Sequence, residues 1–183
     1  MSPTTMKTLL FLGLLALASC CDYNYITDGF WLGGINGTTS NCLSQASITA
    51  VVTVREDPIN YTTLDHYVWI YAKDEPNQQL YDIFSLIHTV MRSWHQDGHN
   101  ILIHCHGGHS RSATVLASYL MRHFTMDATD TLSFMDTKRE IHPNKGFLQQ
   151  LWVYDFFNHS DSQFYPDLQA TLWPKNATLH DLK

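Results

Sequence analysis

A short apolar run and the glycine-containing segment behind it constrain the fold of this chain most strongly. Residues 101–103, Ile-Leu-Ile, predict a buried strand, and residues 112–121, which are mostly apolar or small, predict a helix. Gly107 and Gly108 lie between them, so a glycine turn joins the strand to the helix. Such a turn directs backbone N–H groups toward one point at the helix N-terminus, where they can bind an anion. The sequence therefore predicts an anion-binding loop between a strand and a helix.

Cys105 and Arg111 lie six positions apart around this glycine turn. Converging N–H groups at a helix N-terminus stabilise a thiolate, which is the nucleophilic form of cysteine. The planar guanidinium of an arginine can hold two phosphate oxygens at once. A cysteine and an arginine six positions apart occur by chance in many chains, and such a cysteine is usually an ordinary buried residue. Here the preceding strand, the glycines and the following helix make the prediction of a phosphate-binding loop specific. These residues predict hydrolysis of a phosphate ester, with Cys105 attacking phosphorus opposite the leaving group.

Three segments follow one another in a specific order: residues 26–34 (ITDGFWLGG), 104–113 (HCHGGHSRSA) and 139–151 (REIHPNKGFLQQL). Together they resemble the compact, atypical members of the dual-specificity branch of the cysteine-based protein phosphatase superfamily, over roughly residues 25 to 157. The resemblance implies a single α/β domain with a twisted, mostly parallel central sheet, helices on both faces, and the signature loop between a strand and a helix.

The resemblance also implies a general acid in the turn 72–77. A departing alkoxide or phenolate needs a proton, which a carboxylic acid can supply. Asp74 lies about thirty residues before Cys105, where this branch carries its acid, so Asp74 is expected to protonate the leaving oxygen. The same carboxylate would then take the proton of the attacking water. Glu75, in the same turn, is the rival.

The remaining site residues are assigned by the same resemblance. Ser112 would assist departure of the thiolate in the second step, and it can also cap the helix. His104 would order the loop and tune the cysteine, and Asn144 would help to hold the loop in place. The loop residues expected to bind the phosphate are His106, Gly107, Gly108, His109, Ser110 and Arg111.

His106 and His109 depart from the ordinary loop, which usually carries uncharged residues at these positions. In the related phosphoinositide phosphatases both positions are lysines that attract a highly charged head group, and protonated histidines can do the same. A metal held by this pair would capture the thiolate beside it. We therefore expect neither a metal nor a cofactor at this site.

Length and charge limit the other possibilities. The chain has 183 residues, of which 44% are hydrophobic, as expected for one domain with a sizeable core. Its formal net charge is −6 and no cluster of lysines and arginines occurs, which argues against a nucleic-acid partner. We expect a monomer without a membrane span, whose partner is a phosphorylated protein or peptide.

The first twenty residues resemble a secretory signal peptide. Lys7 precedes an apolar run over residues 9–18, which is shorter than the roughly 20 residues that a spanning helix needs. The segment also resembles a lipoprotein processing site, at which Cys20 would carry a lipid. If residues 1–20 are not a signal, the protein would be cytoplasmic. The catalytic domain is assigned to residues 21–157, and residues 158–183 to a surface or disordered tail.

Glycosylation sequons and cysteine count favour a secreted protein. Chance predicts between one and two Asn-x-Ser/Thr sequons, whereas the chain has four, at Asn36, Asn60, Asn158 and Asn176. Without Cys20, Cys21 and Cys42 remain as a possible disulfide, which leaves Cys105 unpaired.

Periodicity places the other elements coarsely. Residues 48–54 and 67–71 predict strands because they are rich in β-branched and aromatic side chains. Residues 78–97 predict a helix with an apolar stripe that belongs to the core. Another helix is expected near Asp127, and Asn144 is expected to cap the helix that follows it.

The sequence thus predicts a phosphoprotein phosphatase that hydrolyses phosphotyrosine and phosphoserine or phosphothreonine through a cysteinyl-phosphate. Two alternatives stay open. One is a phosphatase acting on a non-protein ester, such as a phosphoinositide, a phosphoglycan or an RNA end. The other is a catalytically inert module that binds phosphate groups through the same loop.

Overall fold

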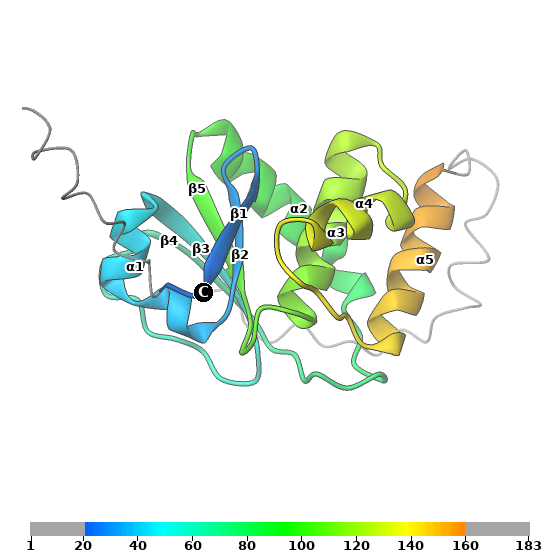
Figure 1. The fold of residues 1–183 in the computed structure, drawn as a ribbon, viewed down its shortest axis with the longest axis horizontal. Coiled ribbons are helices and arrows are strands. Elements are labelled where there is room, and N and C mark those ends of the chain that lie inside the picture. The colour runs from blue at the N-terminus through cyan, green and yellow to red at the C-terminus, as the bar shows by residue number, and fades with distance from the viewer. Residues whose placement is uncertain (1–20, 160–183) are drawn as a thin grey trace, which may run out of the picture.

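The computed structural model describes residues 21–159, and a five-stranded sheet forms their centre (Figure 1). The strand order is β1-β2-β5-β3-β4. β1 and β2 are antiparallel, and every other neighbouring pair is parallel. The strands are β1 (Tyr23–Thr27), β2 (Phe30–Gly33), β3 (Ile48–Val54), β4 (His66–Ile70) and β5 (Asn100–His104). The predicted, mostly parallel sheet is confirmed.

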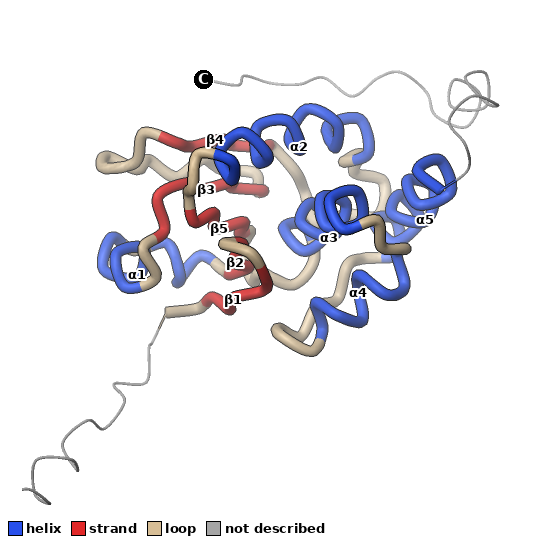
Figure 2. The backbone as a smooth tube through the Cα atoms, turned by 90° about the horizontal axis from the view of Figure 1, so that it is seen from above, coloured by secondary structure: helices blue, strands red, loops and turns tan. Residues whose placement is uncertain are grey.

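Helices cover both faces of this sheet, but unequally. Figure 2 shows α1 on one side and α2 to α5 on the other. The helices are η1 (Ile35–Thr38), α1 (Ser40–Gln45), α2 (Tyr81–Gln96), α3 (Arg111–Phe124), α4 (Ala128–Asp136) and α5 (Lys145–His159). None of the helices within residues 21–159 combines the length and the apolar character that a bilayer crossing requires.

The apolar run in β5 is buried on both faces of the sheet. Ile101 and Ile103 pack into the large core on the side of α2 to α5, whereas Leu102 packs into a smaller cluster with Leu43 and Val51. A central parallel strand covered on both faces is apolar throughout, because neither set of alternating side chains meets water. This burial fixes the position of the loop that follows β5.

The long helix α2 starts three residues later than the periodicity predicts. Its apolar stripe is buried as expected, with Leu80, Phe84 and Met91 at most 1% exposed. The backbone N–H groups of Leu80 and Tyr81 both donate to Oε1 of Gln150 on α5, at 2.7 and 3.0 Å. A side chain 70 residues away in the sequence therefore determines where the helix begins.

Asn144 caps α5 as predicted, and Asp127, near which a helix is expected, proves to be the cap of α4. Asp127 Oδ1 accepts a hydrogen bond from Asp130 N at 2.7 Å, and Asn144 Oδ1 accepts from Gly146 N and Phe147 N. The last helix runs to His159, so residues 158 and 159 of the predicted tail belong to α5. Residues 160–183 and the predicted signal peptide, including Cys20, lie outside the described residues.

The predicted pairing of cysteines is confirmed. Cys21 and Cys42 form a disulfide with an S–S distance of 2.02 Å, and Cys105 is free and buried. The bridge joins the segment before β1 to α1. It therefore fixes the position of Asp22, the residue that follows Cys21.

Buried His88 should make the fold sensitive to acid. This side chain on α2 contacts Ser118 Oγ through Nε2 at 3.0 Å and the Tyr154 hydroxyl through Nδ1 at 3.2 Å. Burial, aided by the charges of Arg122 and Arg92, lowers the pKa of His88 to about 3. The unfolded chain takes up a proton near about pH 6.5, so the stabilisation is complete above that pH and is lost as the pH falls toward 3.

We expect the free energy of unfolding to fall between pH 7.5 and pH 5, with His88 contributing about 1–2 kcal/mol of the decrease. Urea denaturation at the two pH values measures the decrease. In His88→Gln, which lacks the titrating group, the decrease should be smaller by that amount. An equal decrease in both proteins would show that His88 is not its source.

Candidate active site

The predicted loop lies at the carboxyl edge of the sheet, between the end of β5 at His104 and the start of α3 at Arg111. Cys105 is only 1% exposed. Its Sγ accepts a hydrogen bond from the backbone N–H of Gly108 at 3.2 Å and another from the Ser112 hydroxyl at 3.2 Å. Two donors therefore converge on the sulfur.

Gly108 has to be glycine for two reasons. Its φ is +75°, in the left-handed region that most side chains avoid. A Cβ at this position would lie 2.4 Å from the carbonyl carbon of Gly33. The loop can thus approach β2 closely and still direct the Gly108 N–H toward Cys105.

The Arg111 side chain extends from the first turn of α3 to Glu56 and to the segment after β4. Its side chain is 7% exposed, and Nη1 donates to Glu56 Oε2 at 2.5 Å and to the Ala72 carbonyl at 3.1 Å. Nε lies 3.8 Å from Asp74 Oδ2 and has no hydrogen-bond partner among residues 21–159. Burial tends to raise the pKa of Glu56, but hydrogen bonds from its backbone and from Arg111, with the arginine charge, lower it overall. The carboxylates hold the guanidinium at the site.

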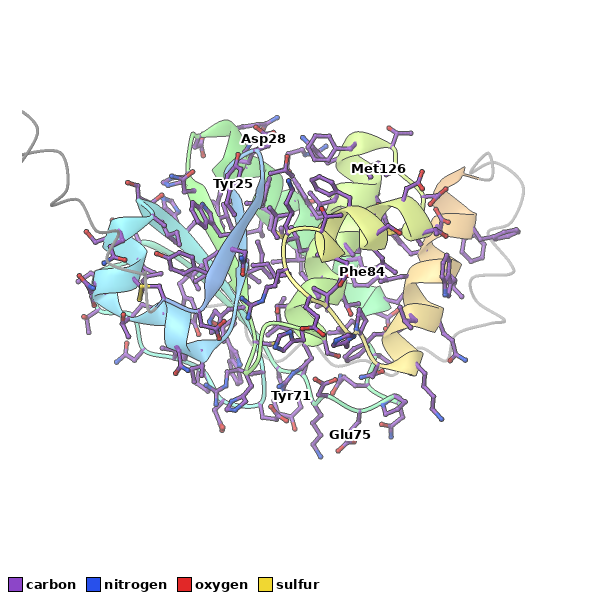
Figure 3. The ribbon with its side chains drawn as sticks, viewed as in Figure 1. Tyr25, Asp28, Tyr71, Glu75, Phe84 and Met126 are labelled. Atoms are coloured by element: carbon purple, nitrogen blue, oxygen red, sulfur yellow. A yellow bond between two sulfur atoms is a disulfide. The ribbon has the colours of Figure 1, made fainter. Side chains whose placement is uncertain are left out.

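Asp74 lies in the turn after β4, beside the loop. Its Oδ1 accepts hydrogen bonds from Ser110 Oγ at 2.7 Å and from Asn144 Nδ2 at 2.9 Å. Glu75 is exposed and lies at the outer margin of the molecule (Figure 3). Of the two candidate acids, only Asp74 contacts the loop in this structure.

The turn that carries Asp74 rests directly on the start of α5. A Cβ on Gly146 would lie 1.8 Å from the carbonyl oxygen of Pro76, so no other residue fits without moving the turn. Asn144 connects the two parts further, because its backbone N–H donates to Ser110 Oγ at 3.2 Å while its side chain donates to Asp74. Asn144 thus contacts both Ser110 of the loop and Asp74, as expected for a residue that helps to hold the loop in place.

His104 is buried behind the loop. Its Nδ1 lies 3.1 Å from the Cys105 carbonyl oxygen, and its Nε2 lies 2.6 Å from Thr53 Oγ1 and 3.0 Å from the Tyr61 hydroxyl. Burial lowers the pKa of His104 to about 4, despite an opposing backbone hydrogen bond to Cys105, so the ring is neutral at pH 7. A neutral ring donates from Nδ1 to the Cys105 carbonyl and accepts at Nε2, which suits a role in positioning the loop.

His106 and His109 are both exposed. His109 is anchored to the segment before α5, because its Nδ1 donates to the Glu140 carbonyl at 2.8 Å and its own carbonyl accepts from His142 N at 2.8 Å. The His106 carbonyl accepts from Ile35 N at 2.9 Å. The backbone at both histidines is therefore held, and their rings face solvent on the loop.

Two charged residues that support the loop, Arg139 and Glu56, are not predicted by the sequence pattern. Arg139 donates to the carbonyls of Gly108 and Gly107 at 3.1 and 2.9 Å, and to Asp22 Oδ1 at 2.6 Å. Glu56, which holds Arg111, follows β3 at the carboxyl edge of the sheet. That position could have indicated Glu56, because polar residues after parallel strands meet at this edge. Nothing in a single sequence connects Arg139 with Asp22, which lies 117 positions earlier.

Comparison with known families agrees with this geometry. The family model described as "Dual specificity phosphatase, catalytic domain" matches residues 30–156. This range includes the loop, Asp74, Glu56 and Arg139. It begins after β1 and ends within α5.

Individual relatives show the same similarity over most of the chain. Dual specificity protein phosphatase 21 of Homo sapiens is 33% identical over 154 residues, covering 78% of this chain and 77% of the relative. Dual specificity protein phosphatase 18 of Bos taurus is 32% identical over 134 residues, covering 72% and 71%. The crystal structure of the human tyrosine phosphatase-like serine/threonine/tyrosine-interacting protein aligns with a TM-score of 0.71 at 25% identity, covering 75% of this chain and 97% of that one. The chain belongs to the dual specificity phosphatases, and it is a protein phosphatase of their compact, atypical kind.

Proposed function

We propose that Cys105, Arg111, Asp74 and Ser112 carry out the phosphatase reaction of this chain in two steps. In the first step the Cys105 thiolate attacks phosphorus, a bond from sulfur to phosphorus forms, and the bond to the leaving oxygen breaks. Protonated Asp74 gives its proton to that oxygen. Arg111 and the loop N–H groups hold the other phosphate oxygens. The free Nε of Arg111 and its distance of 3.8 Å from Asp74 support this arrangement.

In the second step water attacks the phosphorus of the cysteinyl-phosphate. Asp74, now ionised, takes a proton from that water, and the bond from phosphorus to sulfur breaks. The Ser112 hydroxyl, 3.2 Å from Sγ, donates to the sulfur as it regains its negative charge. Inorganic phosphate leaves, and the thiolate and protonated Asp74 are restored. No metal or other cofactor takes part in either step.

The observation that carries this proposal is that the four groups meet at one loop. Gly108 N and Ser112 Oγ contact Sγ, while Asp74 contacts Ser110 of the same loop and lies 3.8 Å from Arg111 Nε. A panel of phosphotyrosine, phosphoserine and phosphothreonine peptides, a phosphoinositide, a phosphoglycan and a 5′-phosphorylated RNA tests it. We expect hydrolysis of the peptides by a monomeric enzyme. Binding of all of them without hydrolysis would instead indicate an inert phosphate-binding module.

A second class of substrate is favoured by His106 and His109. Both histidines are exposed on the loop and can add positive charge where the substrate enters. A substrate with several phosphates, such as a phosphoinositide head group or a phosphoglycan, would benefit most from that charge. The alternative is that these side chains only shape the loop.

The double variant His106→Ala with His109→Ala distinguishes these possibilities. Because histidine gains its charge between about pH 5 and pH 8, we expect the substitutions to raise KM at about pH 5.5 and to have little effect above about pH 8. The increase should be larger for a multiply phosphorylated substrate than for a singly phosphorylated peptide, and should shrink in salt. Equal effects on both substrates at every pH would mean that the histidines only shape the loop.

We propose further that the enzyme is a secreted glycoprotein. Three observations support this proposal: the signal-like composition of residues 1–20, the disulfide between Cys21 and Cys42, and the exposure of the sequon asparagines Asn36 and Asn60. A buried asparagine could not carry a glycan, and these two are accessible.

Expression of the full chain in cultured eukaryotic cells tests this location. We expect the protein in the medium, with a mass that decreases after treatment with an N-glycosidase and with Asn36→Gln and Asn60→Gln. A form without residues 2–20 should stay inside the cells. Retention of the full chain in the cytosol without glycan would contradict the proposal, and retention on membranes with lipid on Cys20 would indicate an anchored protein instead.

A further inference from the structure

Three side chains with metal-binding groups meet at the edge of the sheet opposite the catalytic loop. Asp28 lies in the turn between β1 and β2, His95 in the last turn of α2, and His123 in the last turn of α3. β2 runs parallel to β5, so Asp28 at its start and Cys105 after the end of β5 lie at opposite edges. Figure 3 shows Asp28 at the far side of the molecule from Glu75. The cluster is therefore separate from the catalytic machinery.

The ligand atoms of this cluster are close to a coordination geometry. His95 Nε2 lies 3.2 Å and His123 Nε2 lies 3.9 Å from the same Asp28 oxygen, and all three atoms lie within 4.8 Å of one another. In a tetrahedral zinc site with bonds of about 2.0–2.1 Å, neighbouring ligand atoms are about 3.3 Å apart. Small side-chain rotations would thus bring the three atoms around one ion.

The two imidazole rings are already oriented by their neighbours. The His95 ring packs against Phe30 at a centroid distance of 5.1 Å. The His123 ring is stacked on Tyr119 at 5.3 Å and meets Phe124 edge-on at 4.7 Å. Holding the rings in place reduces the side-chain entropy that binding would cost. Asp28 is half exposed, so a fourth coordination position would be open to water.

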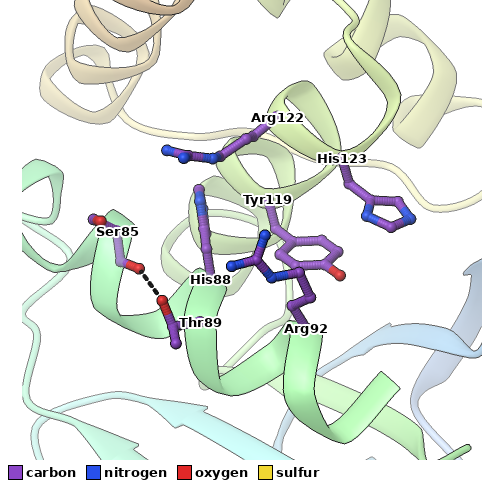
Figure 4. Close-up of a pocket in the computed structure, with 7 residues that line it drawn as sticks. All are labelled: Ser85, His88, Thr89, Arg92, Tyr119, Arg122 and His123. Atoms are coloured by element: carbon purple, nitrogen blue, oxygen red, sulfur yellow. Dashed lines mark hydrogen bonds between the residues drawn. The ribbon is translucent and has the colours of Figure 1, made fainter. Parts of the chain in front are cut away.

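The charges around the three ligand side chains are compatible with binding of a cation. His95 and His123 each lie one residue before the end of a helix, where the partial negative charge of the helix C-terminus favours positive ions. Arg92 and Arg122 line a neighbouring pocket of about 250 Å³ together with His123. Figure 4 shows their guanidinium groups turned toward His88 and away from the His123 ring.

We propose that Asp28, His95 and His123 bind one divalent transition-metal ion, with zinc as the first choice, and that the ion joins the β1–β2 turn to the ends of α2 and α3. Two imidazoles and one carboxylate suit zinc, cobalt, nickel or copper, whereas magnesium and calcium prefer oxygen ligands. The site stabilises the fold and takes no part in phosphate hydrolysis. It lies beyond the proposed function and does not depend on it.

Titration calorimetry with zinc chloride tests the proposal, on untagged full-length protein that carries Cys105→Ser. That substitution removes the thiolate, which would otherwise be a second zinc ligand. We expect one zinc ion per chain, the same stoichiometry with cobalt, and no binding of magnesium. At free zinc about 100 times the Kd, Tm should rise by about 5–10 °C. Absence of zinc binding would overturn the proposal.

Substitution of each ligand locates the ion. Asp28→Asn, His95→Gln and His123→Gln should each weaken zinc binding by about 100-fold or more and abolish the rise in Tm. Asp28→Asn keeps the left-handed turn, in which φ is +46°, because asparagine tolerates it. His66→Gln is the matched control, since His66 pairs with His99 at a ring distance of 4.1 Å and forms no part of the cluster.

The Tm of each variant without metal and its circular dichroism spectrum show whether it is folded. If the three ligand variants are folded and still bind zinc with the parent Kd, the site is elsewhere and the proposal is wrong. Loss of binding in His66→Gln alone would have the same meaning.

Discussion

Cys105→Ser is expected to lower turnover by at least about 10³-fold and to leave binding of phosphate esters intact. A serine hydroxyl at this position stays protonated near neutral pH and cannot replace the thiolate as nucleophile. The groups proposed to bind the phosphate, the Gly108 N–H and the Arg111 guanidinium, are unchanged. Steady-state kinetics measure the loss, and fluorescence anisotropy with a labelled phosphotyrosine peptide measures the retained affinity.

Cys42→Ser combined with Cys21→Ser is the control for the loss of sulfur as such, because these cysteines form the disulfide and act on the loop only indirectly, through Asp22 and Arg139. At a temperature at which it is folded, this double variant should lose some turnover but stay well above Cys105→Ser. If Cys105→Ser keeps turnover within about tenfold of the parent, Cys105 is not the nucleophile.

Asp74→Asn is expected to slow hydrolysis of phosphoserine and phosphotyrosine peptides by about 10²–10⁴-fold. Asparagine can still accept a hydrogen bond from Ser110 and Asn144 through its amide oxygen, but it cannot give a proton to the leaving group. An ester of a very acidic alcohol leaves without help, so its hydrolysis should be slowed much less. The ratio of the two effects is the measurement that identifies a general acid.

Glu75→Gln is the matched variant, because Glu75 lies next to Asp74 in the same turn and its side chain is exposed. It should change neither rate by more than about twofold, as a surface substitution does. If Glu75→Gln shows the dependence on the leaving group and Asp74→Asn does not, the assignment of the acid is wrong.

The parts of the site that the sequence could predict are those that lie close together along the chain. The strand, the glycine turn and the helix from residue 101 to 121 are contiguous, and local periodicity and glycine placement are enough to order them. The disulfide could be inferred from a count of cysteines. Asp74 came from the resemblance, because no local property distinguishes it from Glu75.

The parts that could not be predicted depend on contacts between distant segments. Glu56 reaches Arg111 across 55 positions, and Gln150 reaches Leu80 across 70. A single sequence does not identify the partners in such pairs. The place of Glu56 after β3 indicates the edge of the sheet but not Arg111, and Gln150 looks like an ordinary polar surface residue. The predicted start of α2 is wrong for the same reason, because the contact with Gln150 at its first residues is between distant segments.

The Cys21–Cys42 disulfide and the free Cys105 require opposite redox conditions in an activity assay. The disulfide needs oxidising conditions, and Cys105 needs reducing conditions. A thiol reductant keeps Cys105 in its active form, and the same reagent can open the bridge. Asp22 follows Cys21 directly and contacts Arg139, which holds the carbonyls of Gly107 and Gly108. Reduction of the bridge would therefore loosen the loop that the reductant was meant to protect. Cys21 and Cys42 are both buried, so the bridge should open slowly, and activity in the presence of reductant should decline slowly with time.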